Sequence, residues 1–405
     1  MNTILKGMRV VEGSAFVAIP LAGMTLAQMG AEVIRFDRLQ GGLDARRWPV
    51  THEGQSLFWA GLNKGKKSVA VDMKAPEGRE LITRIITAPG DDAGLFLTNL
   101  RVPGWMDHAT LSALRADLIM VTLIGDRNGR PHVDYTVNPA IGFPDATGPE
   151  GAIAPVAHVL PAWDCIAGGM AVQGLLAAER HRLRKGEGQE VVLTLKDVAA
   201  AMLGNLGIIG EIQINDHERK KGGNSLYGAY GQDFVCSDGR RVMVIGLTDR
   251  QWRGIVDVTA THAAMDELAK KQSIDLTDEG ARYRARSEIT AILAPWFAAR
   301  TVEQIAPLVD RAGVTWSEFR GFRRALDEDP DLSEDNPLFS MLDQPGIGSY
   351  LTPGSPLTFG AAVRDTPTPA PILGQHTEEV LADIAGLSSG EISGLFDRGI
   401  VAGPS

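Results

Sequence analysis

The chain has 405 residues, 44% of them hydrophobic and 22% charged, which is long enough for two or more domains with separate cores. A formal net charge of −10 at pH 7 argues against a protein that binds nucleic acid or an anionic membrane through its overall field. Its two cysteines, with no secretion signal and no apolar run of membrane-spanning length, predict a cytoplasmic protein without a membrane partner.

The first half of the chain alternates short β-type runs with helical segments. Gly30 lies where a helix C-cap is expected, between a helix over Pro20–Met29 and a strand over Ala31–Asp37. This alternation is typical of a parallel sheet covered by helices, so the predicted fold class is α/β. Further strands are predicted at Met8–Glu12, Ser68–Met73, Gly94–Thr98, Leu118–Leu123 and Gln189–Leu195, and further helices at Pro76–Ile86, Thr110–Arg115 and Trp163–Arg184.

The second half has a different pattern. Asp197 is predicted to cap a helix that runs to about Gly210, and a charged, polar crossover follows. Aromatic turns and new helices then indicate a second domain, a Pro-rich segment over Pro345–Pro371 is expected to be extended, and Glu378–Gly399 is predicted to be one amphipathic helix. The predicted organisation is a large domain over 1–205, a crossover linker over 206–223, a small domain over 224–330, and a return linker with the C-terminal part of the large domain over 331–405.

Several common catalytic motifs do not occur in the sequence. No Gly-x-Gly-x-x-Gly follows the first strand, which disfavours a nicotinamide or flavin enzyme, and there is no Walker loop. The eight histidines show no Cys/His pairing at metal-ligand spacing, so no metal is expected. Cys165 is expected to pack in the core rather than act with His158 as a thiol nucleophile, because adjacent helix residues point in different directions.

One carboxylate, Asp164, opens the long apolar helix over Trp163–Arg184. An Asp at this place can be an N-cap that satisfies backbone N–H groups and complements the helix dipole. It can also be a covalent, acyl-accepting nucleophile. Gly168 and Gly169 would let another backbone or a substrate approach the helix closely. The residues alone leave both interpretations open and favour the cap.

Six segments of the chain match one family in order and spacing: an opening strand and loop, the next helix and strand, an Asn-Lys-rich turn, a helix start, a long helix with its turn, and a closing signature. They are Leu5–Pro20, Gly23–Phe36, Leu62–Ser68, Pro76–Glu80, Gly174–Gln189 and Pro371–Glu378. Together they resemble the class III CoA transferases, the group of formyl-CoA transferase and the carnitine and bile-acid CoA transferases. The resemblance spans nearly the whole chain.

This resemblance implies a Rossmann-like large domain with a parallel sheet, a smaller α+β domain and an interlocked, ring-like homodimer. It assigns the family's nucleophilic aspartate to Asp164, and it implies that CoA is part of the substrate, with no other cofactor. Val17 stands where formyl-CoA transferase has a glutamine, so oxalate and formate are disfavoured as substrates. The CoA-binding positions that carry over are Phe16, Val17, Ala18, Arg38, Val71, Asn99, Leu100 and Arg101.

Four segments resemble one branch of that family: Ser56–Asn63, Pro161–Asp164, Tyr227–Tyr230 and Gln344–Ser355. Its members move CoA between the C1 and C4 carboxyls of mesaconate, from 2-methylfumaryl-CoA to 3-methylfumaryl-CoA, in the 3-hydroxypropionate cycle of carbon fixation. Two alternatives stay open. One is an intermolecular CoA transferase between two carboxylic acids, and the other is a non-catalytic acyl-CoA-binding protein.

Some contacts to the substrate have several candidates. The 3′-phosphate of CoA could be held by Arg127, Lys64 or Lys66, and the distal carboxylate by Arg47, Ser14 or Tyr227. Backbone N–H groups of Ala15–Ala18 or Gly222–Gly228 are candidate donors to an oxyanion. The sequence does not rank these candidates.

Overall fold

The computed structural model describes residues 4–404, which form two compact units. Unit 1 holds residues 4–141, 158–210 and 330–404, and unit 2 holds residues 142–157 and 211–329. The segment 142–157 therefore differs from the prediction, which included it in the large domain over 1–205. One reason is local: the Nζ of Lys221 donates hydrogen bonds to the carbonyls of Asp145 (2.6 Å) and Thr147 (2.7 Å), which ties this segment to the crossover.

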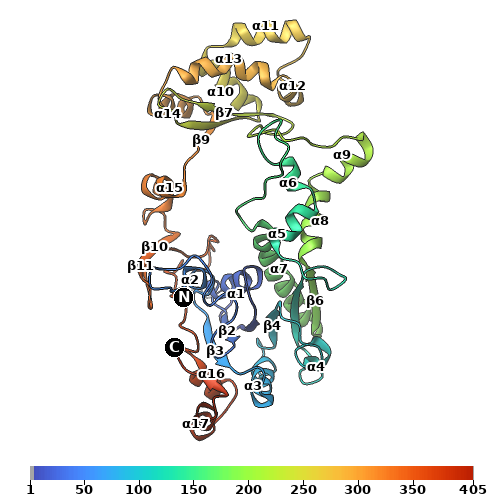
Figure 1. Ribbon diagram of the computed structural model, residues 1–405, viewed down its shortest axis with the longest axis vertical. Helices are drawn as coiled ribbons and strands as arrows, with labels where there is room; N and C mark the ends of the chain where they lie inside the picture. The colour runs from blue at the N-terminus through green and yellow to red at the C-terminus, as the bar shows by residue number, and fades with distance from the viewer. Residues whose placement is uncertain (1–3, 405) are drawn as a thin grey trace. The chain divides into compact units, whose positions relative to one another are not determined.

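Unit 1 is built on a seven-stranded sheet in the order β12-β3-β2-β1-β4-β5-β6. Strands β3, β2, β4 and β6 of this sheet can be followed in Figure 1. Strands β1 to β6 pair in parallel, and β12 pairs antiparallel with β3. The prediction of an α/β fold with a parallel sheet is confirmed. The strands are β1 (Arg9–Gly13), β2 (Glu32–Asp37), β3 (Lys67–Val71), β4 (Leu95–Thr98), β5 (Ile119–Ile124), β6 (Gln189–Thr194) and β12 (Val401–Ala402).

The central strands β1, β2 and β4 are buried along nearly their whole length because helices cover both faces of the sheet. On one face, Phe36 and Phe96 stack with their ring centroids 6.3 Å apart, in a core to which helices α3, α16 and α17 contribute. On the other side, α1 and α7 pack against each other and against the strands. The helices of unit 1 are α1 (Ala18–Gln28), α2 (Leu57–Leu62), α3 (Pro76–Ile86), α4 (His108–Ser112), α5 (Asp134–Ala140), α7 (Ala162–Lys185), α8 (Leu195–Asn205), α16 (Thr377–Asp383), α17 (Ser389–Asp397) and the 3₁₀ turn η1 (Pro330–Leu332).

Two local predictions are wrong. The single helix expected over Glu378–Gly399 is two helices, because Gly386 takes a left-handed φ of 65° and Ser388 starts α17 with a capping box. The cap of α8 is Thr194, whose side chain accepts the backbone N–H of Asp197, so Asp197 lies inside the first turn. The short helices α2 and α5 are elements that the sequence analysis did not predict.

The segment Pro345–Pro371, predicted to be extended, begins within a β-hairpin. Strands β10 (Phe339–Gln344) and β11 (Gly348–Pro353) form an antiparallel hairpin, and residues 354–371 then run without regular structure. The Gln344 side chain holds both backbone groups of Ala370 at 2.9 Å, and the Trp59 indole N–H donates to the carbonyl of Pro371 at 2.9 Å. These contacts fix the end of the segment against α2.

Unit 2 has a three-stranded antiparallel sheet in the order β7-β8-β9, with helices packed on it. Its core includes Phe234 and Phe297, whose rings stack 4.2 Å apart. Its elements are α6 (Phe143–Ala146), β7 (Tyr230–Val235), β8 (Arg241–Gly246), α10 (Asp249–Thr259), α11 (His262–Gln272), α12 (Glu279–Arg284), α13 (Arg286–Ala298), α14 (Val302–Arg311), β9 (Thr315–Glu318) and α15 (Phe322–Glu328).

The predicted crossover linker contains a further helix, α9 (Ile208–Asn215), in which no residue is buried. Among residues 4–404 no single helix has the length and apolar composition to span a membrane, although α8 and α9 together meet that test as a pair bent by 58°.

Candidate active site

Three loops that carry predicted site residues leave the sheet at one edge, where β3 also ends with the predicted residue Val71. Strands β1, β2, β3 and β4 are parallel and neighbouring, and they end at Gly13, Asp37, Val71 and Thr98. The strand order changes direction between β1 and β4, and ligands of open parallel sheets bind in the crevice at such a point. The loops after β1 and β4 both belong to this crevice.

Asn99 joins these two loops. Its side-chain oxygen accepts the backbone N–H of Ala15 at 3.0 Å, and its amide donates to the carbonyl of Ala15 at 2.8 Å. The next residue, Phe16, has a left-handed φ of 68°, a conformation that costs a non-glycine residue energy and therefore needs such support. The Asn99 side chain thus holds the loop that carries Phe16, Val17 and Ala18.

The other predicted CoA contacts lie at the same edge with different exposure. Arg38 and Arg101 are exposed directly after β2 and β4, as phosphate-binding guanidinium groups would need to be. Leu100 is half-buried against the sheet core. Val71 is 1% exposed and its side chain packs in that core, so its backbone is the part that a ligand could reach.

Gly168 brings α7 close to the start of α1. A Cβ at Gly168 would lie 2.8 Å from the carbonyl oxygen of Ala18, so a larger residue would push the two helices apart. Asp164 precedes Gly168 by four residues and shares its helix face, which directs the Asp164 side chain toward the N-terminus of α1. Gly169 faces open space, because a Cβ at this position would have no atom within 4 Å. The predicted close approach is therefore confirmed at Gly168.

The N-cap interpretation of Asp164 is wrong, because another carboxylate performs that role. Asp134, 1% exposed at the start of α5, accepts the backbone N–H of Trp163 at 2.7 Å and that of Asp164 at 3.3 Å. His158 lies with its Nε2 2.8 Å from the other oxygen of Asp134, and Asn138, one turn further along α5, accepts the indole N–H of Trp163. Sequence reasoning missed Asp134 and Asn138, although their i, i+4 spacing is a signal of a shared helix face.

The Asp164 carboxylate is left available. Across residues 4–404, no group donates a hydrogen bond to it, and it is not the N-cap residue of α7, a position that Pro161 occupies. Burial, together with the nearby carboxylate of Asp134, raises the pKa of Asp164 to about 6, while Arg47 opposes this shift. Burial and the carboxylates of Asp164 and Asp134 raise the pKa of Cys165, which disfavours a thiolate nucleophile at this position.

Arg47 is a candidate for holding a substrate carboxylate. Its guanidinium lies over the rings of Phe16 (5.5 Å to the centroid) and Phe58 (5.2 Å), which position the charge beside the first loop. Ser14 is less suited, because its hydroxyl donates to Glu12 at 2.7 Å. Tyr227 lies in unit 2, where its hydroxyl donates to Glu211.

Of the candidates for the 3′-phosphate, Lys66 is excluded by burial. Its Nζ contacts Glu12 at 2.8 Å and donates to the carbonyl of Pro20 at 2.9 Å. Arg127 is exposed and ion-paired with Asp197 at 3.0 Å. Lys64 is 4% exposed and precedes β3, at the amino-terminal edge of the sheet.

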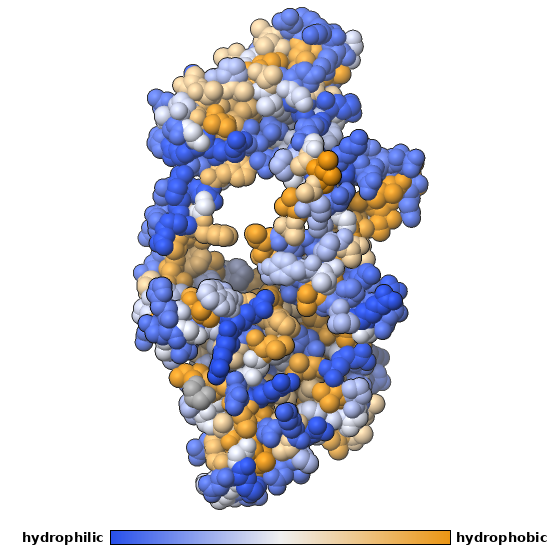
Figure 2. Space-filling view, viewed as in Figure 1, coloured by the Kyte–Doolittle hydropathy of each residue, from blue (hydrophilic) through white to orange (hydrophobic). Residues whose placement is uncertain are grey.

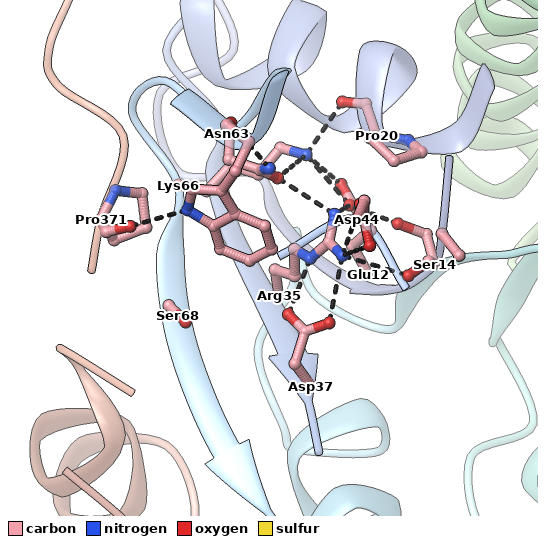
Figure 3. A network of polar contacts seen from close by, with 12 residues as sticks. Glu12, Ser14, Pro20, Arg35, Asp37, Asp44, Asn63, Lys66, Ser68 and Pro371 are labelled. Atoms are coloured by element: carbon pink, nitrogen blue, oxygen red, sulfur yellow. Dashed lines mark hydrogen bonds and ion pairs between the residues drawn. The ribbon is translucent and has the colours of Figure 1, made fainter. Parts of the chain in front are cut away.

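A buried polar network lies beneath the first loop (Figure 3). Arg35 on β2, fully buried, donates to both oxygens of Asp37 (2.8 and 3.1 Å) and of Asp44 (3.1 and 3.0 Å). It also donates to the carbonyl of Ser14 at 3.2 Å, and its guanidinium lies 4.5 Å from the centre of the Trp59 ring. The network therefore fixes the start of the loop that carries Phe16.

Asp134→Asn is expected to move the acidic limb of the pH profile to lower pH. Asp164 is the predicted nucleophile, and a nucleophile of this kind reacts as the carboxylate, so kcat/KM is expected to rise with pH up to about 6 and then level off. Removing the neighbouring negative charge favours ionisation of Asp164 and lowers its pKa, while the asparagine oxygen can still accept the helix N–H groups.

The measurement is kcat/KM between pH 4.5 and 8, with Glu187→Gln, beyond the opposite end of α7, as the charge-matched control. An inflection that stays at the wild-type pH in Asp134→Asn would show that Asp134 does not influence the ionisation of Asp164.

The site combines a parallel sheet with a carboxylate at the start of a helix beside the carboxyl edge of the sheet. Comparison with known protein families identifies the family to which a chain with this site belongs. The family model described as CoA-transferase family III matches residues 5–377, and the chain belongs to this family. It is 56% identical over 405 residues to 2-methylfumaryl-CoA isomerase of Chloroflexus aurantiacus, covering 100% of this chain and 99% of that protein.

More distant relatives share the whole length as well. Succinyl-CoA:D-citramalate CoA-transferase of Chloroflexus aurantiacus is 27% identical, with 98% of each chain covered. The crystal structure of a CAIB/BAIF family protein from Brucella suis superposes with a TM-score of 0.75 at 24% identity, covering 95% of this chain and 100% of that one. This structural likeness establishes the fold.

Proposed function

We propose that this chain catalyses the intramolecular transfer of CoA between the C1 and C4 carboxyls of mesaconate, converting 2-methylfumaryl-CoA to 3-methylfumaryl-CoA. The observation that carries the proposal is the Asp164 carboxylate, which is free of hydrogen bonds within the described residues and lies four residues before Gly168, where α7 packs against the start of α1. The full-length identity of 56% to 2-methylfumaryl-CoA isomerase supports this choice of substrate. We also propose that the enzyme is cytoplasmic and acts in the 3-hydroxypropionate cycle.

The reaction proceeds in four displacements at acyl carbons. The Asp164 carboxylate attacks the C1 thioester carbonyl, which forms a mixed anhydride and releases the CoA thiolate. The thiolate attacks the aspartyl carbonyl, so the C1 carboxylate leaves and an aspartyl-CoA thioester remains. The C4 carboxylate then attacks this thioester and expels the thiolate, forming the C4 anhydride. Attack of the thiolate on C4 gives the product and restores Asp164.

Each displacement passes through an oxyanion, which needs fixed donors. The first turn of α1 begins at Ala18, and the N–H groups of a first helical turn have no partner within the helix. Gly168 holds α7 beside this turn, so these N–H groups are the donors that we assign to the oxyanions formed at C1, at C4 and at the Asp164 carbonyl. The raised pKa of Asp164, about 6, leaves the carboxylate ionised at neutral pH and less strongly solvated than in water.

An exchange experiment tests the proposal. The enzyme is incubated with unlabelled 2-methylfumaryl-CoA and an excess of ¹⁴C-mesaconate until the two isomers reach equilibrium. Because the acid stays bound throughout an intramolecular transfer, less than about one turnover in a hundred should place label in the CoA ester. Label incorporation at a rate similar to isomerisation would instead support the intermolecular alternative.

We further propose that the protein forms an interlocked homodimer. Unit 1 is assembled from segments before and after unit 2 in the chain, so the backbone leaves unit 1 and returns to it, as an interlocked arrangement requires. The exposed apolar residues of helix α9 support the presence of a partner subunit. Ile209 is 38% exposed and Ile212 is 46% exposed, and Figure 2 shows apolar residues gathered over this helix. Surfaces of this kind commonly mark protein interfaces.

The expected result is a dimer of about twice 43.4 kDa by light scattering at micromolar protein. Interlocked subunits separate only when one of them unfolds, so subunits of different isotopic mass should fail to exchange over hours. A stable monomer would contradict the dimer, and rapid subunit exchange would contradict the interlocking.

A further inference from the structure

A cavity of about 420 Å³ lies at the edge of the sheet opposite the Asp164 site. One wall consists of residues that precede β2 and β3, including Gln28, Ala31 and Lys64. The CoA-binding residues follow the ends of parallel strands, whereas these residues come before the starts, so the two sites lie at opposite edges of the sheet. The other wall is the irregular segment 354–371.

The second wall is fixed to the first by hydrogen bonds. The backbone N–H of Gly65 donates to the carbonyl of Pro369 at 3.2 Å, and the side chain of Gln344 holds Ala370 on both sides. The indole N–H of Trp59 donates to Pro371. These three successive residues fix the end of the segment beside Gly65 and α2.

Lys64 brings a buried cation without a counter-charge to this cavity. It is 4% exposed, and within residues 4–404 it has neither an ion pair nor a hydrogen bond for its ammonium. The neighbouring lysines differ: Lys66 pairs with Glu12, and Lys67 pairs with Glu32 and Glu379. A buried, unpaired charge is unfavourable, and burial accordingly lowers the pKa of Lys64 to about 8.

A second donor in the cavity is also unsatisfied. The Nε2 of Gln28 is buried and has no acceptor among the described residues. Buried donors are normally paired, so the unpaired amide of Gln28, in the same cavity as the uncompensated charge of Lys64, indicates an anionic acceptor. Much of the remaining lining is apolar, with Leu357, Phe359 and several prolines, which suits a hydrocarbon group better than a fully hydrated phosphate.

We propose that this cavity is a second, non-catalytic binding site for a small organic carboxylate, whose carboxylate group is held by Lys64 and Gln28 and whose hydrocarbon part packs against Leu357 and Phe359. The anion supplies the missing charge partner for Lys64. The site needs neither Asp164 nor CoA, so it is independent of the proposed reaction.

Protection of Lys64 from reductive dimethylation tests the site in the wild-type protein. Labelling with formaldehyde and cyanoborohydride is followed by peptide mass spectrometry, with butyrate, mesaconate or inorganic phosphate present and with exposed Lys6 as the internal control. At an acid concentration of about ten times Kd, about a tenth of the sites are free, so labelling of Lys64 should slow about ten-fold while Lys6 is unaffected. Protection by either acid, but not by phosphate, supports an organic carboxylate site.

Equal labelling of Lys64 with and without acid would overturn the proposal, and protection by phosphate alone would overturn the choice of ligand. As a second measurement, butyrate should raise the melting temperature of the wild type and of Lys6→Met but not that of Lys64→Met. Stabilisation of Lys64→Met to the same extent as the wild type would show that the acid binds elsewhere.

Discussion

Asp164→Asn is expected to lower kcat by several orders of magnitude, because an amide cannot accept the acyl group as a carboxylate does. No neighbour can replace it: Asp134 is held by the helix N–H groups and by His158, and the pKa of Cys165 is raised. Affinity for the CoA ester should survive, since the CoA contacts are predicted in the loops after β1, β2 and β4. Rates of isomerisation and equilibrium binding of the substrate measure the two effects separately.

The same variant should fold at least as stably as the wild type at pH 7.5. The cap of α7 is Asp134, which the substitution leaves in place, and the raised pKa of Asp164 means that its ionised form is disfavoured in the folded protein. The contribution of Asp164 to the stability of the wild type is fully present below its unfolded pKa of about 4 and is lost as pH rises through its folded pKa of about 6. The melting temperatures of the wild type and Asp164→Asn should therefore differ above pH 6 and converge near pH 4.

Hydroxylamine provides the chemical control for this prediction. During turnover it should convert the aspartyl intermediate of the wild type to a hydroxamate at Asp164, detected by peptide mass spectrometry. Asp164→Asn should yield none. Wild-type enzyme that isomerises its substrate without forming this product would contradict covalent catalysis, and a chain that binds the CoA ester with neither turnover nor product would be an acyl-CoA-binding protein.

Arg35→Met is expected to have the largest effect on stability. It removes the guanidinium that contacts Asp37 and Asp44 and leaves their buried carboxylates without their main partner. Breaking a buried ion pair in this way costs about 3–5 kcal/mol, or roughly 6–20 °C in melting temperature for a domain of this size. The loop at Ser14 would lose a donor as well, so substrate affinity should also fall.

The matched control is Arg38→Met, three residues along the chain and exposed. Its stability should change by less than about 0.5 kcal/mol, as for most surface substitutions, while its affinity for CoA esters falls. Adding Asp37→Asn and Asp44→Asn to Arg35→Met should recover part of the stability, since no buried charge is then left alone. The melting temperatures of the wild type, Arg35→Met, Arg38→Met and the triple variant are measured by calorimetry. If Arg35→Met melted at the same temperature as the wild type, the network would not be stabilising.

The sequence by itself determined the sheet, and it singled out Asp164, whose role as the nucleophile stays a prediction from the family resemblance. The strand predicted at Met8–Glu12 is β1 at Arg9–Gly13, and the helix predicted at Pro76–Ile86 has these same bounds. These signals are local: apolar runs between turns, proline in a first helical turn and Gly30 at a helix end. Asp164 was found in the same way, as a charge at the start of an apolar helix.

The tertiary structure decided what each polar group does, because its partners are distant in the sequence. Asp134 caps helix α7 and lies 30 residues before Asp164 in the sequence. Asn99 forms hydrogen bonds with Ala15, which is 84 residues away, and Lys66 pairs with Glu12, which is 54 residues away. A carboxylate near a helix start has the same appearance in sequence whether or not another group caps the helix. The free energy of a buried polar group depends on whether folding brings it a partner, and the chain's local pattern does not contain that information.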